Sequence, residues 1–259
     1  NDLPLESQAD ISLMSVGGDV AYTQKWENTS ISGKLLYTDL RPYQNLIEQN
    51  FDWEEAPNSL GSEFVFRHKL SQTGIVKVYV NTDNSKFAIR QENINRDNAK
   101  DTFNLENKYL YLNASYKDIL NKQWSIKSGV SVTNNKDMLY LNRYNIYGQE
   151  LGMHSKLALQ WDASEKLSVN MGTDWFSREY FRRTNPINDS PYKTSFKENI
   201  LANFVEADYY ASNRFVVRAG LRSENTSLTN QHFVSPRVAM SYKLKNEGQF
   251  SLAYGQFVQ

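Results

Sequence analysis

Few side chains in this sequence combine types and spacing that could do chemistry, and the first candidate is a histidine. His154 is followed directly by Ser155, and a histidine beside a hydroxyl could act as the base of a hydrolase. The region alternates apolar and polar residues, as a strand does, and successive strand residues point to opposite faces. Base and nucleophile would then be separated, so we expect His154 to be a polar wall residue and the chain not to be an enzyme.

A second candidate is a set of four charged residues near the C-terminus. Glu206 and Asp208 precede Arg218 and Arg222 across a short turn, and alternation places all four on one face. One interpretation is a cross-strand charge ladder, in which opposite charges on neighbouring strands pair. The other is a patch that contacts an anion or a docked domain.

Composition excludes several kinds of site. The 259 residues include 29 basic and 29 acidic residues, so the formal net charge is zero and offers no general attraction to nucleic acid. Cysteine is absent, which excludes disulfides, thiolate metal sites and thiol catalysis, and three histidines leave little material for a metal centre. We expect no cofactor. Mean hydropathy is −0.64, and no apolar run approaches the roughly 18 residues of a membrane helix.

The elements that must position these side chains are predicted to be strands. Twelve stretches alternate apolar and polar residues with period two, which is typical of strands with one dry face. In 74–92 the apolar parity changes between Val80 and Phe87, which predicts one strand with a bulge near 81–85 rather than two strands. The predicted strands are 11–26, 29–40, 61–70, 74–92, 103–117, 122–133, 150–161, 166–181, 197–211, 214–225, 236–244 and 248–258.

The connections between these stretches alternate short and long. The predicted long loops are 41–60, 93–102, 134–149, 182–196 and 226–235. Short turns on one side and long loops on the other are typical of antiparallel membrane barrels. Aromatic and polar residues of the long loops suit ligand binding, and the candidates are Tyr43, Trp53, Arg182, Arg183 and Tyr192.

The two faces of the predicted strands differ sharply in charge. Across the central parts of the strands, His68 is the one titratable residue on the dry parity, whereas the other parity carries many charges. A soluble β-sandwich would show the same alternation. Large aromatics such as Trp26, Trp124 and Trp161 lie on the dry parity beside the short turns, however, where a membrane interface would place them. This placement favours an antiparallel up-and-down transmembrane β-barrel.

The last third of the chain resembles the barrel of TonB-dependent outer-membrane receptors. The residues that carry the resemblance occur in the order found in that family. A hairpin whose second strand ends in "GLR" is followed by a strand that begins with "SPR" and then by a strand that ends in "YG". They are 206–210 (EADYY), 215–222 (FVVRAGLR), 235–242 (SPRVAMSY) and 250–255 (FSLAYG).

This resemblance implies a partial barrel domain over 1–259, belonging to a barrel of 22 strands in the cell outer membrane. It implies uptake of a bulky nutrient with energy from the inner membrane through a TonB-type protein. It also implies a plug domain inside the barrel, outside residues 1–259, which Glu206, Asp208, Arg218 and Arg222 could contact. Outer-membrane lipid would be a further partner.

Two alternatives compete with the partial barrel. One is a complete twelve-stranded barrel that acts as an enzyme or pore, and the other is a soluble β-sandwich with an adhesive role. The partial barrel predicts that 11–26 and 248–258 do not pair, because the family needs about 22 strands and the chain supplies twelve. The sequence also opens without a signal peptide and closes without a terminal aromatic residue.

Overall fold

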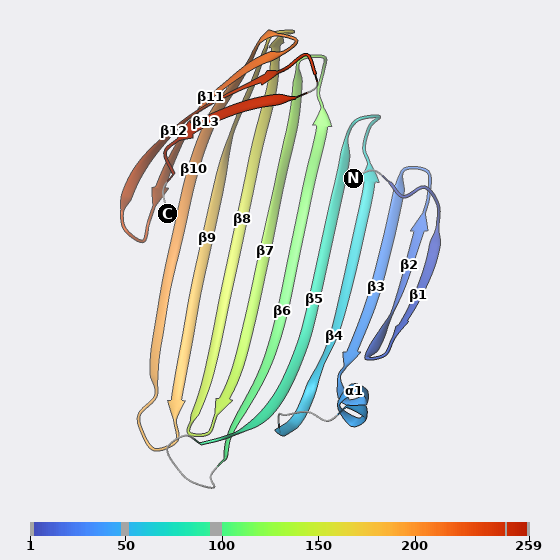
Figure 1. Cartoon of the computed structure of the whole chain (residues 1–259), viewed down its shortest axis with the longest axis vertical. Coiled ribbons are helices and arrows are strands. Elements are labelled where there is room, and N and C mark those ends of the chain that lie inside the picture. Colours follow the sequence, from blue (N-terminus) through green and yellow to red (C-terminus); the bar gives the residue numbers. More distant parts are fainter. Residues whose placement is uncertain (1–2, 48–51, 94–99, 247, 258–259) are drawn as a thin grey trace.

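A single antiparallel sheet makes up almost the whole of the computed structural model, which describes residues 3–47, 52–93, 100–246 and 248–257 (Figure 1). Thirteen strands follow one another in chain order across the sheet. Their bounds are β1 Gln8–Met14, β2 Gly17–Lys25, β3 Thr29–Asp39, β4 Asp52–Lys69, β5 Ile75–Glu92, β6 Lys100–Ile119, β7 Trp124–Leu141, β8 Tyr144–Ser164, β9 Leu167–Pro186, β10 Tyr192–Ser212, β11 Phe215–Thr226, β12 Gln231–Lys243 and β13 Gln249–Gly255.

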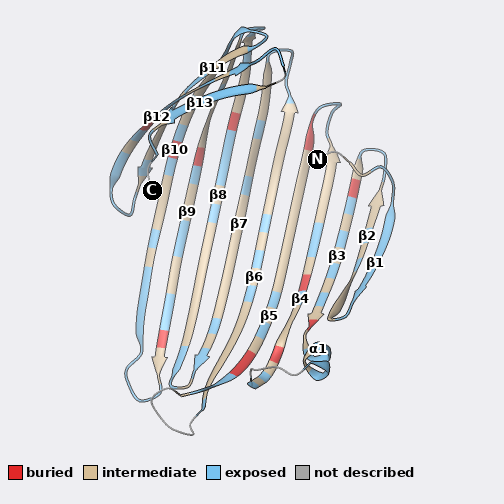
Figure 2. Ribbon diagram, in the orientation of Figure 1, coloured by how far each residue is buried: buried red, intermediate tan, exposed pale blue. Residues whose placement is uncertain are grey.

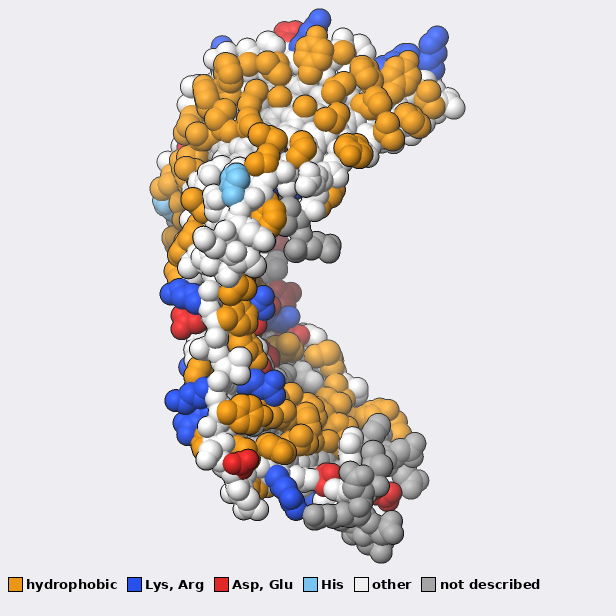
Figure 3. All heavy atoms as spheres, turned by 90° about the vertical axis from the view of Figure 1, so that its left-hand side faces the viewer, with side chains coloured by type: hydrophobic (Ala, Val, Ile, Leu, Met, Phe, Trp, Pro, Cys, Tyr) orange, Lys and Arg blue, Asp and Glu red, His pale blue; other side chains and the backbone are white. Residues whose placement is uncertain are grey.

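The sheet is an open wall rather than a closed barrel. Among the described residues, β1 pairs with β2 alone and β13 with β12 alone. The prediction that the first and last strands do not pair is therefore confirmed, and the complete twelve-stranded barrel is wrong. The wall is curved rather than flat, and Figure 3 shows its concave outline.

One helix, α1 (Arg41–Leu46), follows β3 and carries Pro42 in its first turn, where a missing N–H costs no hydrogen bond. No helix in the described ranges is long and apolar enough to span a membrane.

The predicted strand 11–26 is in fact a hairpin, which raises the strand count from twelve to thirteen. Met14 lies opposite Gly17, so Ser15 and Val16 form the connection between β1 and β2. A Cβ atom on Gly17 would come within 2.2 Å of the Tyr37 carbonyl oxygen, so only glycine fits beside β3. The change of apolar parity from Leu13 to Val20 was the signal of this turn.

The predicted long loops are mostly strand. The interval 134–149 pairs continuously from Asn134↔Leu151 to Leu141↔Tyr144, leaving a two-residue connection in which Asn142 has φ 43°. Neighbouring residues here have the same character on both faces, polar over 134–137 and apolar over 138–141, so period two disappears from the sequence while the backbone ladder continues. Strands also extend into the predicted loops 41–60, 93–102, 182–196 and 226–235, of which residues 48–51 and 94–99 lie outside the described ranges.

The interval 74–92 is one strand, as predicted, but the bulge is absent. β5 pairs with β6 in unbroken register from Ile75↔Lys117 to Glu92↔Lys100. Register shifts occur instead in β4, between Trp53 and Asn58. Phe87 and Ile89 therefore lie on one face of β5, and Val76 and Val80 lie on the other. A bulge would have placed all four side chains on the same face.

The two faces of the wall have opposite character. We call the end with the connections near residues 26–28 and 70–74 the turn end, and the opposite end the loop end. The outer face carries the apolar parity: Val130 of β7, for example, lies opposite Ala114 and Ser155 and is 40% exposed. The inner face carries most of the charges. Hydrophobic side chains cover much of the turn-end half in Figure 3.

Burial excludes the soluble sandwich. Figure 2 shows only scattered buried positions along the strands. The buried hydrophobic residues of the described ranges are mostly small: Ala56, Ile75, Ala88, Ile89, Ala158 and Ala202. A sandwich would bury its large apolar side chains between two sheets. Here Leu35, Leu221 and Leu252 are each about half exposed, so no second layer formed by the described residues covers the outer face.

Large aromatics mark the turn end of the outer face. Trp124 and Trp161 stack with ring centroids 5.7 Å apart, and Phe215 lies 6.4 Å from Tyr242. Trp26 is half exposed at the first turn. Such rings, apolar in body and polar at one edge, suit a boundary between lipid and water. The predicted placement of large aromatics beside the short turns is thereby confirmed, and we call Trp26, Trp124, Trp161, Phe215 and Tyr242 the aromatic girdle.

Candidate functional site: the inner-face hollow

A polar hollow of about 530 Å³ lies on the inner face of β7 to β12. Small residues such as Ala158 and Gly220 line it, and charged side chains surround them. Gly172 sits beneath the Phe204 ring, where a Cβ atom would come within 2.3 Å of the Leu157 carbonyl oxygen. The recess thus follows from side chains too small to fill the inside of a curved sheet.

All four predicted charged residues line this hollow, but they form two separate clusters. In the first, Arg218 donates two hydrogen bonds to Asp208, at 2.6 and 2.9 Å, and its Nε lies 3.4 Å from Glu206. β10 and β11 set Asp208 opposite Arg218, so the predicted cross-strand ladder is present at this pair.

Arg222 belongs to the second cluster, which is centred on Asp174 of β9. Its Nη1 donates to Asp174 at 3.0 Å and its Nε donates to Glu224 at 2.9 Å. His154 Nε2 lies 3.3 Å and Lys156 Nζ 3.6 Å from the same carboxylate. Asp174 is 3% exposed, and Ala202 on the intervening strand β10 leaves space for Arg222 to reach it.

Asp174 is a site residue that was not predicted from the sequence. Its partner Arg222 lies on β11, two strands away, and alternation within one strand carries no information about contacts at that distance. One sign of the site was present in the sequence: Asp174 lies on the polar parity of its predicted strand, and His154 and Lys156 lie on the polar parity of the preceding one.

His154 is held by packing and charge rather than placed beside a nucleophile. Its ring stacks on Phe176 at 4.1 Å, and Ser155 lies on the outer face opposite Val130 and Trp175. This arrangement agrees with the expected polar wall residue. Among the described residues, no group of three or more His, Cys, Asp or Glu side chains could hold a metal ion.

The predicted ligand-binding residues all lie at the loop end, though mainly on strands instead of loops. Tyr43 is on α1, Trp53 on β4, Arg182 and Arg183 on β9, and Tyr192 begins β10. Arg182, opposite Gly148 and Thr194, faces inward. Arg183, opposite Tyr147 and Lys193, faces outward and donates to Asn185 at 2.8 Å. The two arginines therefore cannot line the same inner surface.

An aromatic cluster on the inner face at the loop end was not predicted. Trp53 meets Phe87 edge to face at 6.1 Å, and Phe87 stacks on Phe103 at 5.7 Å. Ile89 and Leu141 lie opposite Phe103, and with the two phenylalanines they line a hollow of about 500 Å³. The parity change in 74–92 was the signal of this cluster, because it moves apolar residues to the inner face.

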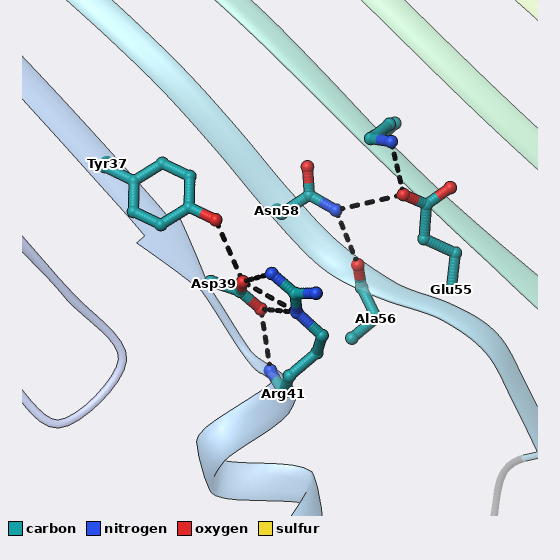
Figure 4. A network of polar contacts seen from close by, with 7 residues as sticks. Tyr37, Asp39, Arg41, Glu55, Ala56 and Asn58 are labelled. Carbon is teal, nitrogen blue, oxygen red and sulfur yellow. Dashed lines mark hydrogen bonds and ion pairs between the residues drawn. The ribbon is translucent and has the colours of Figure 1, made fainter.

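A polar network of Tyr37, Asp39 and Arg41 anchors α1 to the end of β3 (Figure 4). Tyr37 donates to Asp39 at 2.9 Å, and Arg41 donates to the same carboxylate from its guanidinium and from its backbone N–H. Leu40 donates to the Pro57 carbonyl at 3.0 Å, which links α1 to the bulged part of β4. Hydrogen bonds from Arg41 hold the pKa of Asp39 well below its usual range.

We expect Asp39→Asn to loosen α1 without unfolding the wall. Hydrogen–deuterium exchange at Gln44 and Ile47, whose N–H groups bond within this helix, should become faster, while exchange in β3 stays slow. Because the folded pKa is depressed, the contact is fully present above the ordinary aspartate pKa and is lost only as pH falls well below it. Faster wild-type exchange at pH 5 than at pH 7, after correction for the intrinsic rate, would contradict this assignment.

Known proteins with the same architecture were found by comparison of sequence and of structure. The family model described as "TonB dependent receptor-like, beta-barrel" matches residues 25–258. No curated protein matches the chain.

Three solved structures illustrate the shared fold. The RagAB peptide importer in its open-open state aligns with TM-score 0.66 and 11% identity, over 97% of this chain and 39% of that one. The ferric-catecholate import receptor Fiu from E. coli K12 gives 0.62 and 11%, over 96% and 53%. The ferric yersiniabactin uptake receptor FyuA from Yersinia pestis gives 0.64 and 9%, over 98% and 44%. The chain thus spans about half the length of these proteins or less.

Proposed function

Because this chain belongs to the TonB-dependent receptor β-barrel family, we propose that it forms part of the wall of an outer-membrane receptor that imports a bulky nutrient. The family consists of transport receptors of the Gram-negative outer membrane. Energy for import would come from the inner membrane through a TonB-type protein. The observation that carries the proposal is the pairing of an apolar outer face with a charged, hollowed inner face on one curved sheet.

In this proposal each surface of the wall has its own partner. The outer face contacts lipid, and the aromatic girdle at the turn end lies at the periplasmic interface. Residues 1–259 act as one partial barrel domain. The free edges of β1 and β13 pair with further strands, up to about 22 in all, because unpaired backbone groups in lipid cost several kcal/mol each.

The inner hollow is proposed to seat a plug domain. Glu206, Asp208 and Arg218 are half-buried or exposed on its surface and can exchange ion-pair partners with a docked domain. Arg222 is more deeply held by Asp174 and would mainly shape the surface.

The nutrient is proposed to bind at the loop end, which would face outside the cell. Trp53, Arg182 and Tyr192 share the inner face there, whereas Tyr43 and Arg183 lie on α1 and on the outer face and would contact it only at the rim. The solved relatives named above import a peptide and ferric siderophores according to their descriptions. Such cargoes are within the scope of this proposal.

Growth on single nutrients tests the proposal. A strain lacking the gene is compared with its parent on peptides, oligosaccharides or ferric siderophores, each supplied as the sole source of the limiting nutrient. We expect growth to be lost on one class and restored by the re-expressed gene. Loss of the TonB-type protein should cause the same defect. Equal growth on all classes, or growth that is independent of the coupling protein, would contradict the function.

A further inference from the structure

The inner face of β4 to β7 carries a group of cations near the turn end. We call Arg67, Lys69, Lys77, Lys117 and Lys127 the basic band. The register places Arg67 directly opposite Lys77 and Lys117 directly opposite Lys127. Like charges directly opposite each other destabilise an antiparallel pair. The basic band therefore contains two repulsive pairs side by side, with Ile75 between Lys69 and Lys117.

The basic band lacks partners within the wall. In the described ranges none of its five side chains forms an ion pair, and the buried Nε of Arg67 has no hydrogen-bond partner there. The nearest acid on the inner face of β4, Glu63, lies four residues from Arg67, opposite Asn81. On the adjacent strand β8, Asp162 accepts hydrogen bonds from Ser168 and Gln160.

The other half of the inner face is arranged differently. Lys156, Arg178, Arg218 and Arg222 on β8 to β11 each face a carboxylate of the same wall. These four cations are balanced within the wall and need no charged partner from outside it. The basic band has no such balance, and an anion from outside the sheet would relieve its repulsion.

We propose that the basic band binds an acidic surface of a polypeptide domain packed inside the barrel. This inference rests on the proposed function, because it assumes that a domain fills the lumen. Neighbouring strands are about 4.8 Å apart, so the band spans about 14 Å across four strands. That width exceeds what one small anion can contact and fits several carboxylates of a folded surface. The band would fix the rotational position of the domain within the barrel.

Zero-length carbodiimide coupling in the intact receptor tests the proposal. This reagent joins a lysine amine to a carboxylate only where the two are in contact. We expect mass spectrometry to find Lys77, Lys117 and Lys127 joined to acidic residues outside the thirteen strands. Lys77→Gln and Lys117→Gln should each remove the crosslinks at their own position. Lys166→Gln, an exposed lysine of the β8–β9 turn, serves as the matched control and should change none of them.

Charge reversal provides a second readout that loss of folding cannot imitate. Lys77→Glu with Lys117→Glu converts both repulsive pairs into attractive ones, so the wall should fold at least as well as before. The acidic partner would now be repelled, and we expect increased entry of a large antibiotic that the outer membrane normally excludes. An unchanged barrier in this double variant would overturn the proposal.

The remaining outcomes distinguish failure of the docking inference from failure of the proposed function. If the band lysines are acetylated as fast as Lys166 and form no crosslinks while nutrient growth is normal, the docking inference fails and the proposed function stands. Protection of these lysines by inorganic phosphate, without any crosslink to a polypeptide, would identify a small-anion site instead and also refute the docking inference. The growth test alone decides whether the proposed function is wrong.

Discussion

Val130→Lys is expected to destabilise the membrane-inserted receptor by about 2–4 kcal/mol, the cost of a lysine facing lipid near the bilayer midplane. Val130 lies on the outer face of β7, six residues from Trp124 at the turn end and four from Asn134, where the polar part of that face begins. Its cross-strand neighbours, Ala114 and Ser155, offer no charge to a lysine. Urea titration of the receptor folded into lipid vesicles measures the loss.

Ser131→Lys is the matched control for this prediction. Ser131 is the next residue of the same strand, opposite Asn113 and His154 on the inner face, where a lysine can remain hydrated. Its cost should be far smaller than that of Val130→Lys. Similar costs at the two positions would show that the outer face does not contact lipid.

Asp174→Ala is expected to be the most damaging change on the inner face. Asp174 is 3% exposed and contacts Arg222, His154 and Lys156. Removing one partner of a buried ion pair leaves an uncompensated charge, which costs about 3–5 kcal/mol when burial is complete. Arg222 keeps Glu224 at 2.8 Å and is partly exposed, so we expect about 3 kcal/mol, at the lower end of that range. The same vesicle titration measures it.

Arg218→Ala gives the comparison for Asp174→Ala. The Arg218 side chain is 54% exposed, and solvated ion pairs contribute about 0–1 kcal/mol. The two variants remove ion pairs from the same hollow, and they differ mainly in burial. A larger loss of stability for Arg218→Ala than for Asp174→Ala would show that burial does not determine which of the two clusters contributes more to stability.

The sequence predicted the class of fold because the relevant signal is local. Alternation in 122–133 assigned Val130 to one face and Ser131 to the other, and the register confirms both. Aromatic residues next to short turns, such as Trp124 and Trp161, indicated the same edge that the structure shows. The family resemblance seen in residues 206–255 agrees with the family model that matches 25–258.

Errors arose where the two faces of a strand do not differ or where parity changes. In 134–149 the two faces do not differ in polarity, so strand was interpreted as loop, and Arg182 and Tyr192 were placed in loops for the same reason. The parity change at Leu13 marks a hairpin, whereas the one at Phe87 marks an apolar patch on the inner face of an unbroken strand. A single sequence does not distinguish these two cases.

The sequence by itself determined the direction of each side chain along most of the wall, because alternation follows from the covalent geometry of an extended chain. It also placed Glu206, Asp208, Arg218 and Arg222 on one face. Only the tertiary structure decided which charges meet: Arg218 with Asp208, Arg222 with Asp174 two strands away, and Arg67 against Lys77 with no acid to separate them. Register and curvature belong to the paired sheet as a whole, and they set those distances.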